Sequence, residues 1–392
     1  MTIETLRFPP DVNETVFLRD YWQTRPLLMR GAMPGFAPPI DPDELAGLAC
    51  EAEVESRLVL EKDGIRPWEA RPGPFDEDDF AALPDSHWTL LVQDVDKHVP
   101  EVAALLEPFR FIPDWRVDDI MISYAPDQGS VGPHVDDYDV FLLQAHGRRR
   151  WRIHTRPLDE NDYIPGLDLR ILPHFEAEQD WVLEPGDILY LPPNVAHWGV
   201  AEGDCMTYSV GFRAPELRDL TRTLSEVWVQ RRIPTGRYRD PKLSPQSASG
   251  EILPEVFEHL GRTMGDLPFA ADPLFRVWVG RYLTETKDNL ALDPPSAPLE
   301  RDQFAVALDR HGGLTRSGYA RMAFCRGENG QHLLFVNGGD YALSSGHGEL
   351  LRVLTGERWL DREDLSPWLR DAECLDLLCR LYNDGCFEFP DD

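Results

Sequence analysis

Short apolar runs separated by glycine, proline and aspartate dominate the sequence up to about Pro215. The clearest are HWTLLVQDV, DDIMISYAP, YDVFLLQA, RRWRIH, DWVLEPGDILYLPP and DCMTYSVGFRAP. Runs of this kind are typical of short strands, and they favour an antiparallel sandwich or barrel over alternating βαβ units. No glycine-rich loop follows a strand, so a dinucleotide-binding or P-loop fold has no support.

The hydrophobic period changes after Pro215. Apolar residues then recur every three or four positions, which indicates one face of a helix; they are Leu217, Leu220, Leu224, Val227 and Trp228. Two more helices are expected in LPEVFEHLGRTMG and PLFRVWVGRYLTETK. The apolar face of the first helix either packs in a core or forms the seam of a symmetric homodimer.

The last part of the chain mixes both kinds of element. DPPSAP at 293–298 is a candidate linker, after which helix-like stretches at 302–310 and 371–383 alternate with strand-like HLLFVNGGDYALS and CFEF. A length of 392 residues favours two or three domains. We therefore expect an α+β protein with a β-rich domain at 1–215, a helical region at 216–295 and a small α+β module, such as a winged helix, at 296–392.

Charge and composition exclude several classes of partner. Asp and Glu number 69 against 39 Lys and Arg, a formal net charge of −30. This charge disfavours nucleic acid and anionic membranes and would attract a basic partner. The six cysteines form no C-x-x-C pair, the N-terminal segment lacks a signal or transit pattern, and no run is long enough to span a membrane. We expect a cytoplasmic protein that does not bind nucleic acid directly.

Two motifs predict a metal site. His134 and Asp136 are two residues apart, a spacing that puts both side chains on one face of a strand. His197 follows the strand-like ILYL and its Pro-Pro corner. Two histidines and one carboxylate form the facial triad of non-haem Fe(II) oxygenases, which leaves positions open for an oxo-acid and O₂.

A buried cation is expected beside the metal. In FLLQAHGRRRWRIH we expect a hairpin with its turn at His146 and Gly147, followed by a strand on which Arg149 faces inward. An inward arginine is costly unless it meets an anion such as a carboxylate, whereas the neighbouring arginines suit a solvated face. Ser123, on the preceding strand, is a weaker candidate for a hydroxyl donor to the same carboxylate.

The sequence resembles the JmjC-type ribosomal oxygenases. The resemblance rests on YWQTRPLLMRGA, TLLVQDVD, SYAPDQGSVGPHVDDYDVFLLQAHGRRRWRI and GDILYLPPNVAHWGVA; beyond residue 215 only the layout matches. It implies a double-stranded β-helix of the cupin type, a helical dimerisation region and a winged-helix tail. Bacterial members hydroxylate an arginine of a basic large-subunit ribosomal protein.

The resemblance also implies roles for individual residues. Fe(II) would be held by His134, Asp136 and His197, and 2-oxoglutarate would pair with Arg149 and Ser123. Asp127 matches the acidic residue that receives the substrate guanidinium, although PDQG is also a good turn sequence. Two alternatives stay open: an oxygenase for a histidine or a small molecule, and a non-catalytic cupin regulator, which the charge of −30 disfavours.

Overall fold

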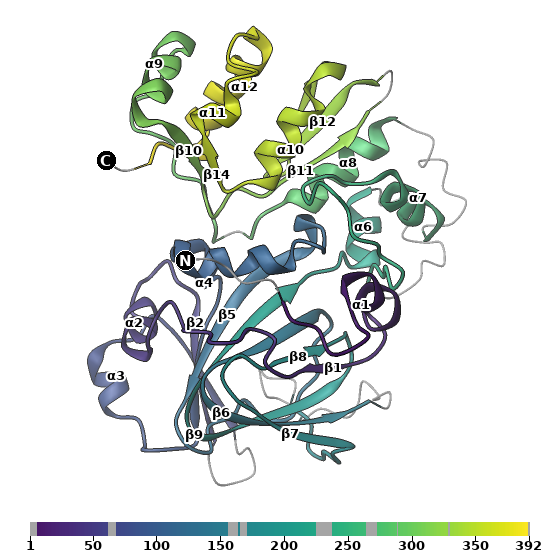
Figure 1. Ribbon diagram of the computed structural model, residues 1–392. Coiled ribbons are helices and arrows are strands. Elements are labelled where there is room, and N and C mark those ends of the chain that lie inside the picture. Colours follow the sequence, from purple (N-terminus) through teal and green to yellow (C-terminus); the bar gives the residue numbers. More distant parts are fainter. Residues whose placement is uncertain are drawn as a thin grey trace. The chain divides into compact units, whose positions relative to one another are not determined.

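The structure is a computed structural model that describes residues 6–61, 68–155, 164, 171–224, 237–263, 273–287, 289–327 and 330–390. The chain divides into two compact units (Figure 1). The first comprises residues 1–111, 117–214 and 239–245, and the second comprises 112–116, 215–238 and 246–392. The finer division of residues 216–392 into a helical region and a separate module stays a prediction.

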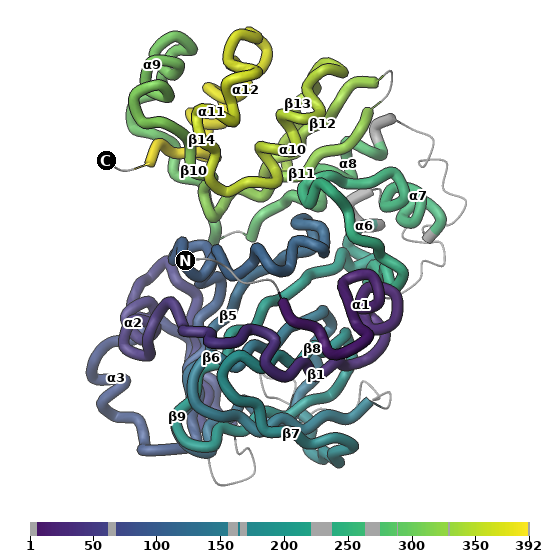
Figure 2. Tube along the Cα trace, in the orientation of Figure 1, coloured from purple at the N-terminus to yellow at the C-terminus, as the bar shows by residue number. Residues whose placement is uncertain are grey.

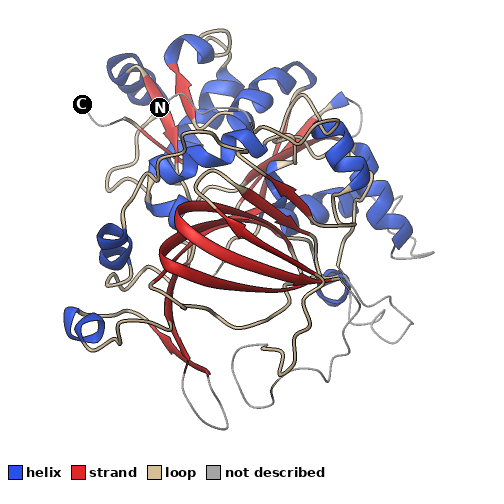
Figure 3. Ribbon diagram, turned by 60° about the horizontal axis from the view of Figure 1, so that its bottom comes forward, coloured by secondary structure: helices blue, strands red, loops and turns tan. Residues whose placement is uncertain are grey.

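A nine-stranded sheet forms the first unit, and its long strands curve around a common interior (Figure 3). Its strand order is β1-β8-β6-β9-β5-β4-β2-β3, with β7 paired to β6. The pairs are antiparallel, as the sequence predicts. The strands are β1 (Leu27–Met29), β2 (Ser56–Glu61), β3 (Trp68–Pro72), β4 (Trp88–Val92), β5 (Val117–Ala125), β6 (Asp139–His154), β7 (Gln179–Leu183), β8 (Ile188–Leu191) and β9 (Ala196–Phe212).

The predicted hairpin at His146 and Gly147 is wrong. β6 runs without a turn from Asp139 to His154 and pairs with β9 along its length. The pairing register instead shifts twice, once between Gln144 and His146 and again between His146 and Arg148. Glycine there marks a bulge rather than a reversal, because the partner strand continues beyond it.

Short helices surround this sheet: α1 (Glu14–Asp20), α2 (Pro42–Leu48), α3 (Glu77–Ala81), α4 (Val95–His98) and α5 (Pro100–Ala103). α1 begins where the Asn13 side chain accepts a hydrogen bond from the Val16 amide, as an N-cap does. Its buried Phe17 lies 4.8 Å from the Tyr190 ring of β8, centroid to centroid. This packing closes the outer face of the sheet.

The second unit has its own core. Its elements are α6 (Leu217–Leu224), α7 (Pro254–Thr263), α8 (Pro273–Thr284), α9 (Arg301–His311), β10 (Gly313–Arg316), β11 (Met322–Arg326), β12 (His332–Val336), β13 (Gly339–Leu343), α10 (Gly348–Gly356), β14 (Trp359–Asp361), α11 (Arg362–Leu365), α12 (Ala372–Asn383) and β15 (Phe387–Glu388). α12 lies beside α9, although β10 to α11 separate them in sequence (Figure 2). Leu308, Leu351 and Leu378 are buried in the core between these elements.

The helix predicted after Pro215 is present as α6, with Leu217 and Leu220 buried. The Leu224 side chain, Val227 and Trp228 lie outside the described residues. None of the helices in the described part of the chain combines the length and apolar character that a membrane crossing requires.

Candidate active site

The backbone brings the two candidate histidines together. His134 precedes β6 and His197 is the second residue of β9, yet each donates its amide to the other's carbonyl, at 3.0 and 2.9 Å. The two rings therefore lie side by side, with centroids 4.2 Å apart. The expectation of a regular strand at 134–136 is wrong, because His134 makes only isolated bridges and Asp136 lies in the connection to β6.

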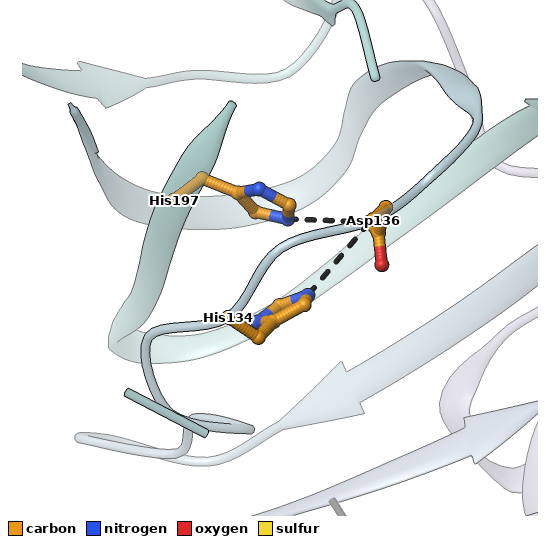
Figure 4. Close-up of side chains that lie close together, drawn as sticks. All are labelled: His134, Asp136 and His197. Atoms are coloured by element: carbon orange, nitrogen blue, oxygen red, sulfur yellow. Dashed lines mark ion pairs between the residues drawn. The ribbon is translucent and has the colours of Figure 1, made fainter. Parts of the chain in front are cut away.

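Asp136 completes the cluster (Figure 4). One carboxylate oxygen, Oδ2, lies 3.4 Å from Nε2 of His197 and 3.8 Å from Nε2 of His134. One donor atom from each of the three residues lies within 4.8 Å of the other two. Nitrogen, nitrogen and oxygen donors at such spacing fit a divalent transition metal.

The histidines are oriented to offer Nε2. Nδ1 of His134 lies 2.9 Å from the Gly132 carbonyl, and Nδ1 of His197 lies 3.0 Å from the Val195 carbonyl. A carbonyl only accepts, so each Nδ1 carries the proton and each Nε2 presents a lone pair. Burial first, and His134 second, lower the pKa of His197 to about 4, so its imidazole is neutral at physiological pH.

Arg149 is a buried cation that pairs with no carboxylate among the described residues. Its side chain is 2% exposed, and within the described chain it forms no ion pair with a carboxylate. Its Nε has no hydrogen-bond partner, while Nη2 donates to the Gly199 carbonyl at 3.3 Å. Cys205 lies 4.0 Å from Nη1, but burial raises the pKa of that thiol, so it supplies no negative charge. The surroundings of Arg149 therefore suit an anionic ligand.

Ser123 lies on the face of the sheet that it shares with Thr207 and Gln144. It is the register partner of Thr207 on β9, which in turn pairs with Gln144 on β6. Register partners face the same side of a sheet. The Ser123 hydroxyl is buried and donates to the Thr207 carbonyl at 3.4 Å, a long contact that a better acceptor would replace.

Asp127 occupies the turn that its sequence predicts. The Gly129 amide donates to the Pro126 carbonyl at 2.9 Å, and Asp127 is exposed at the tip. Its Oδ1 accepts from the Gly203 amide at 2.8 Å, and this bond holds the pKa of the carboxyl below its usual value. Asp127 is thus a fixed, exposed negative charge.

Sequence reasoning missed the residues that support Arg149 and the histidines. Gly199 leaves room for the guanidinium, and Ser130 donates to the Gly199 carbonyl at 2.7 Å. Trp151 lies against the guanidinium, 5.2 Å from its carbon to the ring centroid. These contacts join residues far apart in sequence, so no local sequence pattern predicts them.

A second group of donor atoms lies in the second unit, formed by His347, Asp371 and Cys374. Asp371 is the N-cap of α12 and accepts from the Glu373 and Cys374 amides. His347 lies between Asp371, at 3.1 Å, and Glu373, at 3.6 Å. Helix capping accounts for this group without a metal.

Comparisons with known proteins agree with this geometry. A family model described as JmjC domain matches residues 104–220, and one described as ROXA-like winged helix matches residues 266–388. The ribosomal protein uL16 3-hydroxylase of Escherichia coli (strain K12) is 38% identical over 373 residues, which cover 95% of this chain and 96% of that protein. The chain belongs to the JmjC-type ribosomal oxygenases.

Solved structures extend the match to the whole chain. The E. coli ribosomal oxygenase YcfD in complex with cobalt and 2-oxoglutarate is 36% identical, covers 99% of each chain and has a TM-score of 0.76. A bifunctional lysine-specific demethylase and histidyl-hydroxylase NO66, from Drosophila persimilis, is 26% identical over 210 residues, half of this chain and 29% of that protein. The predicted cupin jelly roll and C-terminal winged helix of this ribosomal oxygenase are confirmed.

Proposed function

We propose that this chain is an Fe(II)- and 2-oxoglutarate-dependent oxygenase that hydroxylates an arginine of a large-subunit ribosomal protein. The observation that carries the proposal is the buried Arg149, which pairs with no described carboxylate and lies against Trp151, whose ring is 5.8 Å from that of His197. A buried arginine without a carboxylate partner is costly unless an anionic ligand meets it. The name of the E. coli relative, a uL16 3-hydroxylase, supports the same reaction.

His134, Asp136 and His197 would hold the iron. When bound, iron supplies the oxidative decarboxylation of 2-oxoglutarate by O₂ and the oxidation of an unactivated C–H bond. The chain contributes ligand geometry: the Gly132 and Val195 carbonyls fix the two tautomers, and burial keeps His197 neutral. A metal therefore meets free Nε2 lone pairs and displaces no proton from His197.

Arg149 and Ser123 would bind the distal carboxylate of 2-oxoglutarate. The guanidinium offers a planar pair of donors, and the Ser123 hydroxyl adds one more. Since the interior is largely closed to water around Arg149, the carboxylate gains strongly from this charge. The carboxylate holds the reacting end of the co-substrate in one orientation.

Asp127 would receive the guanidinium of the substrate arginine. A fixed carboxylate at an exposed turn selects a permanently charged, planar cation over a neutral imidazole. The histidyl-hydroxylase relative matches over only half of this chain, whereas the uL16 hydroxylase matches over 95%. Arginine is therefore the first candidate, and histidine the second.

We further propose that the enzyme is a homodimer in the cytoplasm. We propose that residues 216–295 contribute a homodimer seam, although Leu217 and Leu220 of α6 are buried within the single chain and therefore belong to its own core. A ribosomal substrate and a charge of −30 support a cytoplasmic enzyme that contacts the protein rather than the RNA. Sedimentation at several concentrations tests the seam, and a monomer at micromolar concentration would remove it.

Succinate production tests the proposed reaction directly. The purified chain is incubated with iron, 2-oxoglutarate, O₂ and a fragment of the ribosomal protein that contains the target arginine. Succinate is expected to accumulate faster with this fragment than with one in which lysine replaces that arginine. Equal rates with the two fragments would contradict the arginine assignment, and no succinate with either would contradict the proposed chemistry.

A further inference from the structure

The inward-facing side chains of β6 switch from even-numbered to odd-numbered positions along the strand. Gln144 pairs with Thr207, whereas Arg149 pairs with Ala201, and the register shifts twice between these two pairs. In a regular strand, side chains an odd number of positions apart lie on opposite faces. Arg149 would then face outward, yet it is 2% exposed and contacts Cys205 in the interior. The bulge therefore decides which arginine of the RRR run faces the interior.

Gly147 allows this bulge. Its φ is +60°, a left-handed conformation that glycine adopts without steric cost. A Cβ at this position would lie 1.9 Å from the Asp204 carbonyl oxygen of the opposing strand. Any side chain here would push β6 and β9 apart just before Arg149.

Gly199 provides the space that Arg149 then fills. A Cβ there would lie 2.6 Å from Nε of Arg149 and 2.7 Å from the Trp151 ring. The Gly199 carbonyl also accepts the bond from Nη2. Unlike Gly147, Gly199 has no left-handed φ, so its backbone tolerates alanine, and the Arg149 guanidinium and the Trp151 ring have to move.

Arg150, the next residue, points to the outward face of the sheet. Arg150 donates from Nε to Glu202 at 3.0 Å and from Nη1 to Asp180 at 3.2 Å. Anions therefore stand outside the sheet, where Arg150 points, while Arg149 meets no described carboxylate inside. A register slip would exchange these two environments.

We propose that Gly147 and Gly199 are positioning residues that set the affinity for 2-oxoglutarate by aiming Arg149 into the interior of the sheet. Gly147 selects the inward arginine, and Gly199 places its guanidinium. This inference rests on the proposed function, in which Arg149 binds the co-substrate carboxylate.

Steady-state kinetics of Gly199→Ala and Gly147→Ala test the inference. The KM for 2-oxoglutarate is expected to rise about tenfold to a hundredfold in each variant, because small displacements of a binding group have effects of this size. The KM for the ribosomal fragment and the affinity for Co(II) are expected to stay within about twofold of the parent, since neither involves the guanidinium. At saturating 2-oxoglutarate the turnover rate of each variant is expected to approach the parental kcat, which general unfolding would not allow.

Gly35→Ala is the matched control for backbone strain. Gly35 has a φ of +68°, and a Cβ there meets nothing within 4 Å. It is therefore expected to lose stability without any change in the KM for 2-oxoglutarate. If Gly147→Ala does not fold, Gly199→Ala decides the positioning role, because the backbone of Gly199 has no left-handed φ.

Arg149→Ala separates the role of Arg149 in binding 2-oxoglutarate from the role of the two glycines in positioning it. If this variant keeps the parental KM for 2-oxoglutarate, the proposed role of Arg149 fails. If Arg149→Ala raises the KM and folded Gly199→Ala or folded Gly147 variants do not, the positioning role alone is overturned.

Discussion

Single residues carry most of the functional prediction. His134, Asp136 and His197 could be selected from the sequence because metal ligands are few in type and their spacing is constrained by the fold. The structure brings them within 4.8 Å, although Asp136 lies in a connection rather than on a strand. Supporting contacts such as Ser130 to Gly199 could not be predicted, because they depend on which strands become neighbours.

Removal of one candidate ligand tests the metal site. Asp136→Ala leaves two histidines and no carboxylate, so Fe(II) affinity and 2-oxoglutarate turnover are both expected to fall by a factor of about a hundred or more. Metal affinity is measured by competition with a chelator, and turnover by succinate formation. His174→Ala, at an exposed histidine, is the control and is expected to change neither. Parental turnover in Asp136→Ala would remove the assignment.

Acid is expected to weaken the metal-free protein through His197. Its pKa is about 4 in the folded state and about 6.5 in an unfolded chain, so between these values the unfolded state binds more protons. Stability therefore falls as pH drops through this window, by an amount on the order of 3 kcal/mol. Urea unfolding of the metal-free protein between pH 7 and about pH 4 measures the loss. His197→Gln is the control, and an equal acid dependence in that variant would contradict the assignment.

The positions of strands were easier to predict from the sequence than the way in which the strands connect. The apolar runs identified β4 to β9 because period-two patterns depend only on local sequence. The hairpin at His146 and Gly147 failed because glycine after a strand marks either a turn or a bulge, and the pairing of β6 with β9 decides between them. β2 and β3 were not predicted, since RLVLE and WEARP carry charges within short runs.

The outer face of the sheet depends on one buried carboxylate. Asp139 at the start of β6 is fully buried and accepts from the Tyr190 hydroxyl at 2.6 Å and from Gln23 Nε2 at 3.0 Å. Tyr190→Phe removes one of these donors from a buried charge and is expected to cost about 1–3 kcal/mol of unfolding free energy. Denaturant titration measures it. Tyr21→Phe, whose half-buried ring lies beside Phe17, is the control; an equal loss in both variants would contradict the argument.

The whole molecule carries a charge of −30, and substrate and co-substrate have opposite signs. A basic ribosomal fragment is attracted to this surface, whereas anionic 2-oxoglutarate is repelled until it reaches Arg149. Added salt screens both effects. The KM for the fragment is therefore expected to rise with ionic strength, while the KM for 2-oxoglutarate stays constant or falls. A fragment KM that is independent of salt would show that the acidic surface has no part in recognition.

Domain order could be predicted from the change in hydrophobic period near Pro215, because a shift from period two to period 3.6 is visible in sequence alone. The boundaries in space were less accessible. Residues 112–116 belong to the second unit although they precede Pro215, and residues 239–245 belong to the first unit although they follow it. Tertiary packing, which local sequence does not reveal, decides such assignments.

Mass spectrometry of the ribosomal protein tests the central claim most directly. The basic large-subunit protein is incubated with this chain, iron, 2-oxoglutarate and O₂, then digested and sequenced by fragmentation, with Asp136→Ala as the inactive control. One added oxygen on an arginine side chain, absent from the control, is the predicted result. An oxygen on a histidine instead, or no added oxygen in the active sample, would contradict the account.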